Sequence, residues 1–514
     1  MRKLIIIVIL FAFSTPIFAQ FSIMQDTTVT YVLPDSVDMQ DEPATHIFTD
    51  GVNNQHYKPK KSFGPLIAAS EVIVLNAGVH IFDRFILKTD WAQVKFSDIG
   101  NNFKKGFVWD NDYLSTNMFW HPYHGGLYFN SARANGLNFW QSVPYSFAGS
   151  FIWEFFGETN YPSINDLLAT SIGGMAIGEM THRVSHLVLN DSKHGIERVG
   201  REILAGIISP MDMLNRILSG KAWHHSPFDE TQNVEKPNFV INLAVQNRFM
   251  TDLDNNRNNS NVALGFTAIY GNPFADQKRL PYDYFTANID FNIIGKQPLI
   301  SNGSIIGLLW GNNWEKKNYN FLAGVFQHFD YYNSNPLIEN GKLPYEYAEA
   351  ASFGGGFLAK KQKNENKPPI FTGSFYANFI LLGASESDYY SVYERNYNFG
   401  MGFSVKVNAA VNFAKRFSAF FNAKTYQIFT LNKAVDEDYY SIYDEYNSQG
   451  NNGYAQLHLL GVGIGCKIFK WLNVNVEQRF FIRHSHYKYF DDVSANSMEN
   501  RVRIVFSLFN NDEK

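Results

Sequence analysis

The stretch Trp471–Arg483, WLNVNVEQRFFIR, alternates between apolar and polar residues and decides the fold class. One face is apolar except for Gln478, and the other is largely polar or charged. The apolar face holds Leu472, Val474, Val476, Phe480 and Ile482, and the polar face holds Asn473, Asn475, Glu477, Arg479 and Arg483. A period of two is that of a β-strand. Over ten or more residues it predicts a strand that crosses a membrane between lipid and a wet lumen.

The same alternation recurs from about Pro237 to the C-terminal end of the chain. In Arg501–Phe509, for example, Val502 and Ile504 oppose Arg501 and Arg503. We count about twelve such strands, and an even number returns both ends of a barrel to one side of the membrane. Their expected starts are Asn238, Asn261, Asp283, Ser304, Lys317, Tyr345, Pro369, Tyr393, Arg416, Asn452, Trp471 and Glu499.

The predicted connections alternate in length. Short turns are expected at Glu315–Lys317, Ala414–Arg416 and Lys467–Lys470. Mostly long polar loops are expected at Thr251–Ser260, Asn333–Leu343, Ser385–Tyr390, Asn432–Asn451 and Ser485–Ser497. Outer-membrane barrels show this alternation, with the short turns on the periplasmic side. The sequence therefore predicts an α+β membrane protein: a C-terminal antiparallel transmembrane β-barrel of about twelve strands with an N-terminal helical domain.

Composition agrees with an envelope protein. Aromatic residues make up 16% of the chain, with 46 Phe and 28 Tyr, as the aromatic girdles of membrane strands require. The net charge of −4 argues against a nucleic-acid partner. Cys466 is the single cysteine, so an internal disulfide is excluded, and a thiol nucleophile or a cysteine zinc site is disfavoured.

Four segments are predicted along the chain. Residues 1–19 have a basic start, an apolar core and a small residue at Ala19, which indicates a secretory signal peptide. Residues 20–60 are polar and acidic and are expected to form a mobile arm. Residues 61–225 are expected to form a helical domain on the periplasmic side, and residues 237–510 an outer-membrane barrel.

Three apolar helices are expected in the helical domain, at Pro65–Leu87, Leu137–Glu158 and Ser163–Leu189. The first is long enough to span a membrane, but its Asn76, His80 and Asp83 form a polar stripe that makes this expensive. The third begins with Ser163-x-x-Asp166, a capping-box pattern. The stretch HPYHGG (His121–Gly126) is interpreted as a turn, because it combines a proline with two glycines.

Polar residues on these helices form the candidate site. Candidate catalytic residues are Glu154, Glu158, Glu179, His186 and Arg133, and candidate ligand-binding residues are His121, His124, Asp166 and Arg183. Carboxylates with Glu-x-x-His on facing helices can hold a metal ion or a general acid/base pair. Buried charges are, however, normally paired. Structural pairing of Glu154 or Glu158 with Arg183, Arg133 or Arg201 is therefore the favoured interpretation. Acid/base catalysis and metal binding remain alternatives, and no cofactor or metal is assigned.

Several short motifs together resemble an uncharacterised family of exported Gram-negative envelope proteins, classed as a domain of unknown function. They are HPYHGG (His121–Gly126), AR-x-x-G (Ala132–Gly136), WE-x-x-x-E (Trp153–Glu158), IND (Ile164–Asp166), GE (Gly178–Glu179), RE (Arg201–Glu202), NRILSG (Asn215–Gly220), GNPF (Gly271–Phe274) and PYDYF (Pro281–Phe285). The resemblance covers roughly Pro65–His224 and the first barrel hairpins. It implies a helical region followed by a barrel and brings no established activity.

Three functions remain open at this point. The first is envelope transport or binding of a lipid or small-molecule ligand. The second is a membrane-associated hydrolase that acts on lipid or glycan through the Glu/His/Arg residues. The third is a surface-structural or adhesive role. The expected surroundings are outer-membrane lipid and lipopolysaccharide, with a monomer favoured.

Overall fold

The computed structural model describes residues 24–25, 63–225, 237–275, 279–337, 341–362, 369–430, 434–435 and 448–510. The predicted signal peptide and almost all of the predicted arm lie outside these residues. The exception is β1 (Met24–Gln25), which pairs in parallel with Ile300 and Ser301. The chain divides into two compact units, one built mainly from residues 54–236 and the other mainly from 237–440 and 449–514.

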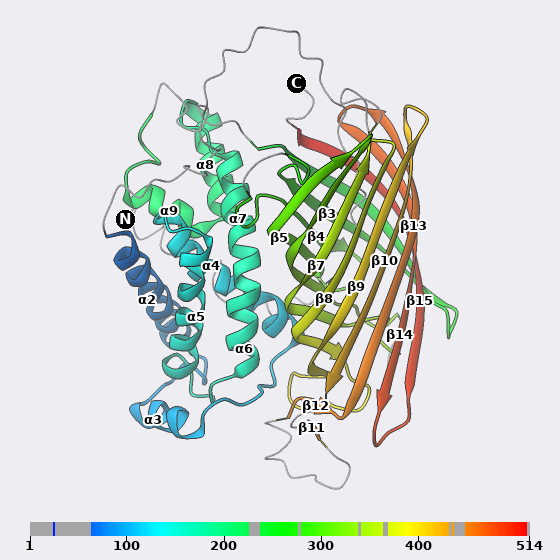
Figure 1. Ribbon diagram of the computed structural model, residues 1–514. Coiled ribbons are helices and arrows are strands. Elements are labelled where there is room, and N and C mark those ends of the chain that lie inside the picture. Colours follow the sequence, from blue (N-terminus) through cyan, green and yellow to red (C-terminus); the bar gives the residue numbers. More distant parts are fainter. Residues whose placement is uncertain are drawn as a thin grey trace. The chain divides into compact units, whose positions relative to one another are not determined.

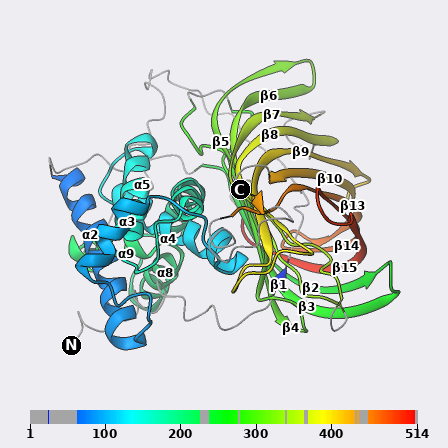
Figure 2. The ribbon, with the colours of Figure 1, turned by 90° about the horizontal axis from the view of Figure 1, so that it is seen from below.

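The C-terminal unit is a closed antiparallel β-barrel (Figures 1 and 2). Its strands are β2 (Phe239–Asp252), β3 (Arg257–Tyr270), β4 (Phe285–Ile294), β5 (Ile300–Lys316), β6 (Tyr319–Tyr332), β7 (Tyr347–Lys361), β8 (Phe371–Glu386), β9 (Tyr397–Phe413), β10 (Phe417–Thr430), β13 (Gly453–Phe469), β14 (Leu472–Tyr487) and β15 (Val493–Asn510). Neighbours in the ring are neighbours in sequence, except where β15 pairs with β2. That pairing closes the ring and sets Asn510 beside Val240, so both ends of the barrel lie at the same rim.

The predicted fold class is confirmed, because each of the twelve expected strands has a counterpart in the barrel. The predicted long loops at Thr251–Ser260 and Ser485–Ser497 are wrong. Strands β2 and β3 stay paired up to Asp252 and Arg257, and the Asp252 carboxylate accepts the backbone N–H groups of Asp254 and Asn255 to close a tight turn. Polar residues there continue the strands, because paired strands satisfy their own backbone groups whatever their side chains.

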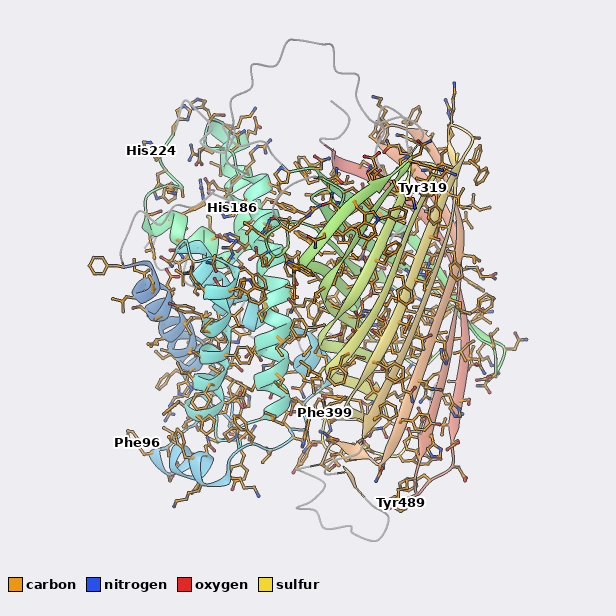
Figure 3. All side chains as sticks on the ribbon, viewed as in Figure 1. Phe96, His186, His224, Tyr319, Phe399 and Tyr489 are labelled. Atoms are coloured by element: carbon orange, nitrogen blue, oxygen red, sulfur yellow. The ribbon has the colours of Figure 1, made fainter. Side chains whose placement is uncertain are left out.

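The barrel wall is apolar outside and polar inside. On β15, Val502 is 50% exposed while Arg501 is fully buried, as the alternation predicts. Exposed aromatic residues gather near the rim where β15 ends, among them the stacked pairs Phe413–Phe417 and Phe469–Trp471. Figure 3 places Tyr319 at one end of the barrel and Tyr489 at the other. An apolar outer band with aromatic rims is the surface of a barrel that spans an outer membrane.

Side chains fill the lumen at two levels. At one level a buried cluster joins Met250 of β2 to Tyr347 of β7, although these strands are separated by four others on the shorter way round the ring. A second cluster contains Ile306, Phe326 and Tyr376. Ion pairs lie among them, including Lys406 with Asp330 at 2.5 Å and with Glu349 at 2.7 Å. Side chains of opposite walls therefore pack against each other across the lumen.

The N-terminal unit is helical (Figure 1). Its elements are α2 (Gly64–Phe82), the π-helical turn η3 (Asp83–Leu87), α3 (Phe96–Lys105), η4 (Thr116–Trp120), α4 (His121–Ala134), α5 (Phe139–Phe156), α6 (Ile164–Leu168), η5 (Ala169–Gly173), α7 (Gly174–Val188), α8 (Gly195–Ile208) and α9 (Pro210–Leu218). The three expected helices correspond to α2–η3, α5 and α6–η5–α7. Ser163 is the N-cap residue of α6, but its side chain makes no capping hydrogen bond.

The interpretation of HPYHGG as a turn is wrong, because His121–Ala134 is a continuous helix. Pro122 lies in the first turn of α4, directly after the π-helical turn η4, where the helical hydrogen-bond pattern changes. The glycines serve helix packing. A Cβ on Gly125 would lie 1.7 Å from the Thr170 carbonyl oxygen, and one on Gly174 would lie 2.4 Å from the Gly125 carbonyl carbon. Helix α4 therefore touches η5 and α7 backbone to backbone.

The helical unit buries polar residues and exposes many apolar ones. Buried polar side chains include Asn76, Asn130, Ser146, Ser150 and Thr170. Helix α2 with η3 is 24 residues long and, by length and composition alone, apolar enough to cross a membrane. More than half of the surface of six of its apolar side chains is exposed: Leu66, Ile73, Val74, Ile81, Phe85 and Ile86.

Candidate functional site

The predicted site residues fall into two separate groups at opposite ends of α4. His121 begins this helix and Arg133 lies in its last turn, about 18 Å away at 1.5 Å per residue. Glu154, Glu158, Asp166, His121 and His124 lie near the first end and are called the carboxylate cluster. The second end carries Arg133, Glu179 and Arg183, together with His182, His186 and Asp212. The structure therefore does not bring all the predicted catalytic residues into one site.

The carboxylate cluster is built where α5 ends and α6 begins. Glu154 is 3% exposed, and its Oε2 accepts the backbone N–H of Ser163 at 2.7 Å. Glu158 accepts the indole N–H of Trp153 at 2.5 Å. Asp166 accepts the amide of Asn165 at 2.9 Å, and the same amide group donates to Asp110 at 2.8 Å. Four carboxylates are thus held close together by neutral donors.

These carboxylates resist ionisation. Burial raises the pKa of Glu158 to about 7, against the hydrogen bond from Trp153. Burial, with the charge of Glu158, raises the pKa of Glu154 well above its usual value, and burial with the charge of Asp110 does the same for Asp166. Among the residues that the structure describes, no lysine or arginine pairs with Glu154 or Glu158. The predicted pairing of these two residues with Arg133, Arg183 or Arg201 is therefore not found.

The two histidines of HPYHGG point into the same region. His121 Nε2 lies 3.7 Å from Asp166 Oδ1. The His124 ring stacks on Tyr128 with centroids 4.8 Å apart, and its Nε2 is buried with no hydrogen-bond partner among the described residues. Burial, followed by the charge of His121, lowers the pKa of His124 to about 3. Burial therefore shifts the carboxyl groups and the imidazoles of this cluster towards their neutral forms.

Glu179 lies between two guanidinium groups at the other end of α4. Arg133 binds it through two bonds of 2.7 and 3.2 Å, and Arg183, one turn further along α7, donates at 2.7 Å. Burial would raise its pKa, but the charges of Arg133 and Arg183, with His182, lower it to about 2. Glu179, and not Glu154 or Glu158 as expected from the sequence, is therefore the glutamate that pairs with arginines here.

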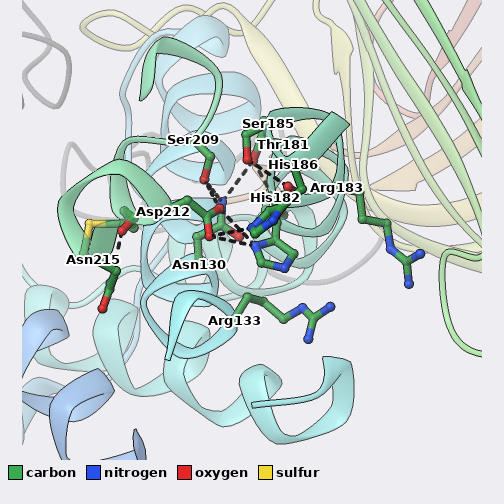
Figure 4. Close-up of polar contacts among 12 residues, drawn as sticks. Asn130, Arg133, Thr181, His182, Arg183, Ser185, His186, Ser209, Asp212 and Asn215 are labelled. Carbon is green, nitrogen blue, oxygen red and sulfur yellow. Dashed lines mark hydrogen bonds and ion pairs between the residues drawn. The ribbon is translucent and has the colours of Figure 1, made fainter. Parts of the chain in front are cut away.

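His182 and His186 meet Asp212, a residue that the sequence did not single out (Figure 4). His182 Nδ1 lies 2.9 and 3.0 Å from the two Asp212 oxygens, and His186 Nε2 lies 3.3 Å from Oδ1. Asp212 lies in the first turn of α9 behind Pro210. The only sequence signal is Ser209-Pro210, which can start a helix and would place Asp212 in its first turn. No sequence pattern links Asp212 to the histidines of α7.

Among the described residues, His182, His186 and Asp212 are the group whose donor atoms could hold a metal ion, since these atoms lie within 4.8 Å of one another. The carboxylate cluster does not meet this spacing. Its chemistry is instead that of proton sharing, because adjacent buried carboxyl groups cannot all ionise.

Solved structures similar to this chain are outer-membrane barrels. The NanC porin shares 10% identity with a TM-score of 0.27, and the match covers 52% of this chain and 100% of that one. An outer-membrane channel from Pseudomonas putida F1 shares 6% with a TM-score of 0.30, covering 53% and 96%. The KdgM porin shares 7% with a TM-score of 0.23, covering 52% and 99%. Such weak likeness adds nothing to what the strand pairing shows.

No curated protein matches the chain. A family model does match within the helical unit, over residues 106–211. This segment contains both ends of α4 and most of the motifs on which the sequence resemblance rests, which confirms that resemblance. Residues 106–211 thus match the family described as a domain of unknown function, DUF3943.

Proposed function

We propose that this protein is an outer-membrane lipid-binding protein in which the barrel is the anchor and the helical unit is the binding part. The observation that carries this proposal is the apolar outer face of α2 and η3. A helix that faced only water would not leave Ile73, Val74 and Phe85 more than half exposed along one element. Acyl chains are the ligand that such a face fits.

Charge at one end of this face favours phospholipid headgroups. The chain leaves η3 at the exposed Lys88 and then enters α3, where Phe96 is 94% exposed. Figure 3 labels Phe96 at the edge of the helical unit. Exposed Lys104 and Lys105 end α3, and Phe103 packs on Phe155 of α5 with ring centroids 4.6 Å apart. Aromatic residues beside lysines are typical of segments at a lipid–water interface.

The filled lumen argues against transport through the barrel. A pore needs a continuous polar path, whereas here buried side chains of opposite walls contact each other. The proposal also places the helical unit on the periplasmic side. Its support is that the unit precedes β2, and that the rim shared by Val240 and Asn510 carries the two-residue turns 317–318 and 470–471. Short turns are periplasmic in outer-membrane barrels.

Site-directed spin labelling of the full chain tests lipid binding. Cysteine is placed at Ile73, Val74 or Phe85 in a Cys466→Ala background, and the protein is reconstituted in phospholipid bilayers. We expect labels on α2 to collide more with oxygen than with a water-soluble nickel complex. A label at the exposed Lys193 should show the reverse. Water-like accessibility at all three α2 positions would refute the proposal.

A second function is favoured by one observation, the set of protonated carboxyl groups around His121 and Asp166. A neutral carboxyl next to a neutral imidazole is the arrangement of a general acid/base pair. If the protein is an enzyme that hydrolyses envelope lipid or glycan, the substitution Glu154→Gln should abolish its activity. Glutamine can still accept the hydrogen bond from the Ser163 backbone N–H, so the geometry is kept. The activity is measured from the lipid profile of cells that carry this variant, and a profile identical to that of cells with the unchanged protein excludes the hydrolase.

A further inference from the structure

The group His182, His186 and Asp212 joins two helices through three metal-ligand side chains (Figure 4). The histidines are one turn apart on α7, and the aspartate comes from α9. We propose that these three residues bind a divalent transition-metal ion of the zinc class. This site is independent of the proposed lipid surface on α2.

The donor separations suit a tetrahedral ion. Ligand atoms about 2.0–2.1 Å from zinc in a tetrahedron lie about 3.3 Å from one another. His186 Nε2 lies 3.3 Å from Asp212 Oδ1, and His182 Nδ1 lies 2.9 Å from Oδ2. The rings of His182 and His186 are 4.5 Å apart at their centroids. All three donor atoms lie within 4.8 Å of one another, so side-chain adjustments would bring them around one ion.

The Asp212 carboxylate is held in place from behind. Ser209 Oγ donates to Oδ2 at 2.6 Å, and Asn130 Nδ2 donates to Ser209 Oγ at 3.1 Å and to Thr181 Oγ1 at 3.0 Å. Metal sites commonly fix their ligands through such outer hydrogen bonds.

The buried Asp212 carboxylate also lacks a lysine or arginine partner among the described residues, which favours a bound cation. Asp212 is 4% exposed, and its ion-pair partners in the described chain are the two histidines alone. Arg133 and Arg183, the nearby cations, bind Glu179. A bound cation would balance the charge of this buried carboxylate.

One side of the site is open to solvent, because the His186 side chain is 33% exposed. Three protein ligands with an open side are typical of zinc sites that keep a position for water or for a donor of a bound molecule. The ion would therefore join α7 to α9 and present an exchangeable position at the surface of the helical unit.

Zinc binding to the purified full-length protein tests this inference. The protein is incubated with Zn²⁺ and desalted, and its zinc content is measured by elemental mass spectrometry. Binding of Co²⁺ is followed by the visible absorption of the bound cobalt. We expect a single ion per chain with a tetrahedral cobalt spectrum. His186→Ala and Asp212→Asn should abolish binding, and Ser209→Ala should weaken it by about 10–100-fold. The control His194→Ala removes one ring of an exposed histidine pair, His194–His225, and should bind normally.

A second measurement avoids variants that fail to fold. In the unchanged protein, bound Zn²⁺ should protect His182 and His186, but not His194 and His225, from acylation by diethyl pyrocarbonate. Zinc that stays bound to Asp212→Asn, or the absence of zinc-dependent protection at His186, would overturn the proposal.

Discussion

Glu179 and Glu158 are both buried glutamates of the helical unit, and their environments drive them to opposite charge states. Glu179 lies between Arg133 and Arg183, which lower its pKa to about 2. Glu158 has an indole N–H as its hydrogen-bond partner and carboxyl groups as neighbours, and burial raises its pKa to about 7. The difference is due to where the cations are, because desolvation penalises both carboxylates in the same direction.

This contrast assigns different roles to the two ends of α4. A carboxylate in two short ion pairs is a fixed link between α4 and α7, and it stays ionised over any physiological pH. A carboxyl group that titrates near neutral pH without a cation is unusual as a purely structural element. The end at Arg133 is therefore expected to matter for stability, and the end at His121 for proton chemistry.

The largest effect is expected from Glu179→Gln, which keeps the shape but removes the charge between two buried arginines. Breaking one partner of a buried ion pair costs about 3–5 kcal/mol. The helical unit should lose about that much stability, measured by chemical unfolding followed by helical circular dichroism while the barrel stays folded. Glu197→Gln, on an exposed carboxylate of α8, is the control. A change no larger than that of the control would show that the arginine pair does not need Glu179.

A smaller effect of opposite sign is expected from Glu158→Gln. The folded unit holds a proton on Glu158 up to about pH 7, whereas an ordinary glutamate releases it near 4.5. Folding therefore becomes less favourable as pH rises from about 4.5 to 7. Glutamine, which still accepts the Trp153 bond, should stabilise the unit by about 1–3 kcal/mol at pH 8 and change little at pH 4.5. An equal effect at both pH values would contradict the raised pKa.

Much of the barrel, but little of this contrast, could be predicted from the sequence. Strand alternation is a local signal, so residues such as Val502 and Arg501 reveal their faces without knowledge of their neighbours. The helix at His121 was missed because the reason for Gly125 is a contact with Thr170, forty-five residues away in sequence. Likewise, helical spacing indicated which helix faces carry Glu154, Glu179 and Arg133. It could not indicate near which end of α4 each of these side chains lies. Asp212 meets His182 only because α7 and α9 both pack against α4 and α8.

The smallest of these effects, and the one that separates charge from geometry, is expected from Arg133→Lys. Lysine keeps the cation beside Glu179, but it cannot make the paired bonds of 2.7 and 3.2 Å together with the bond to the Leu137 carbonyl. We expect a loss of about 1–2 kcal/mol from the missing hydrogen bonds. The pH dependence should remain that of the unchanged protein, since the carboxylate stays ionised and its stabilisation disappears only as pH falls from 4.5 towards 2. If stability instead became pH-dependent between 5 and 8, the low pKa of Glu179 would depend on guanidinium geometry more than on charge.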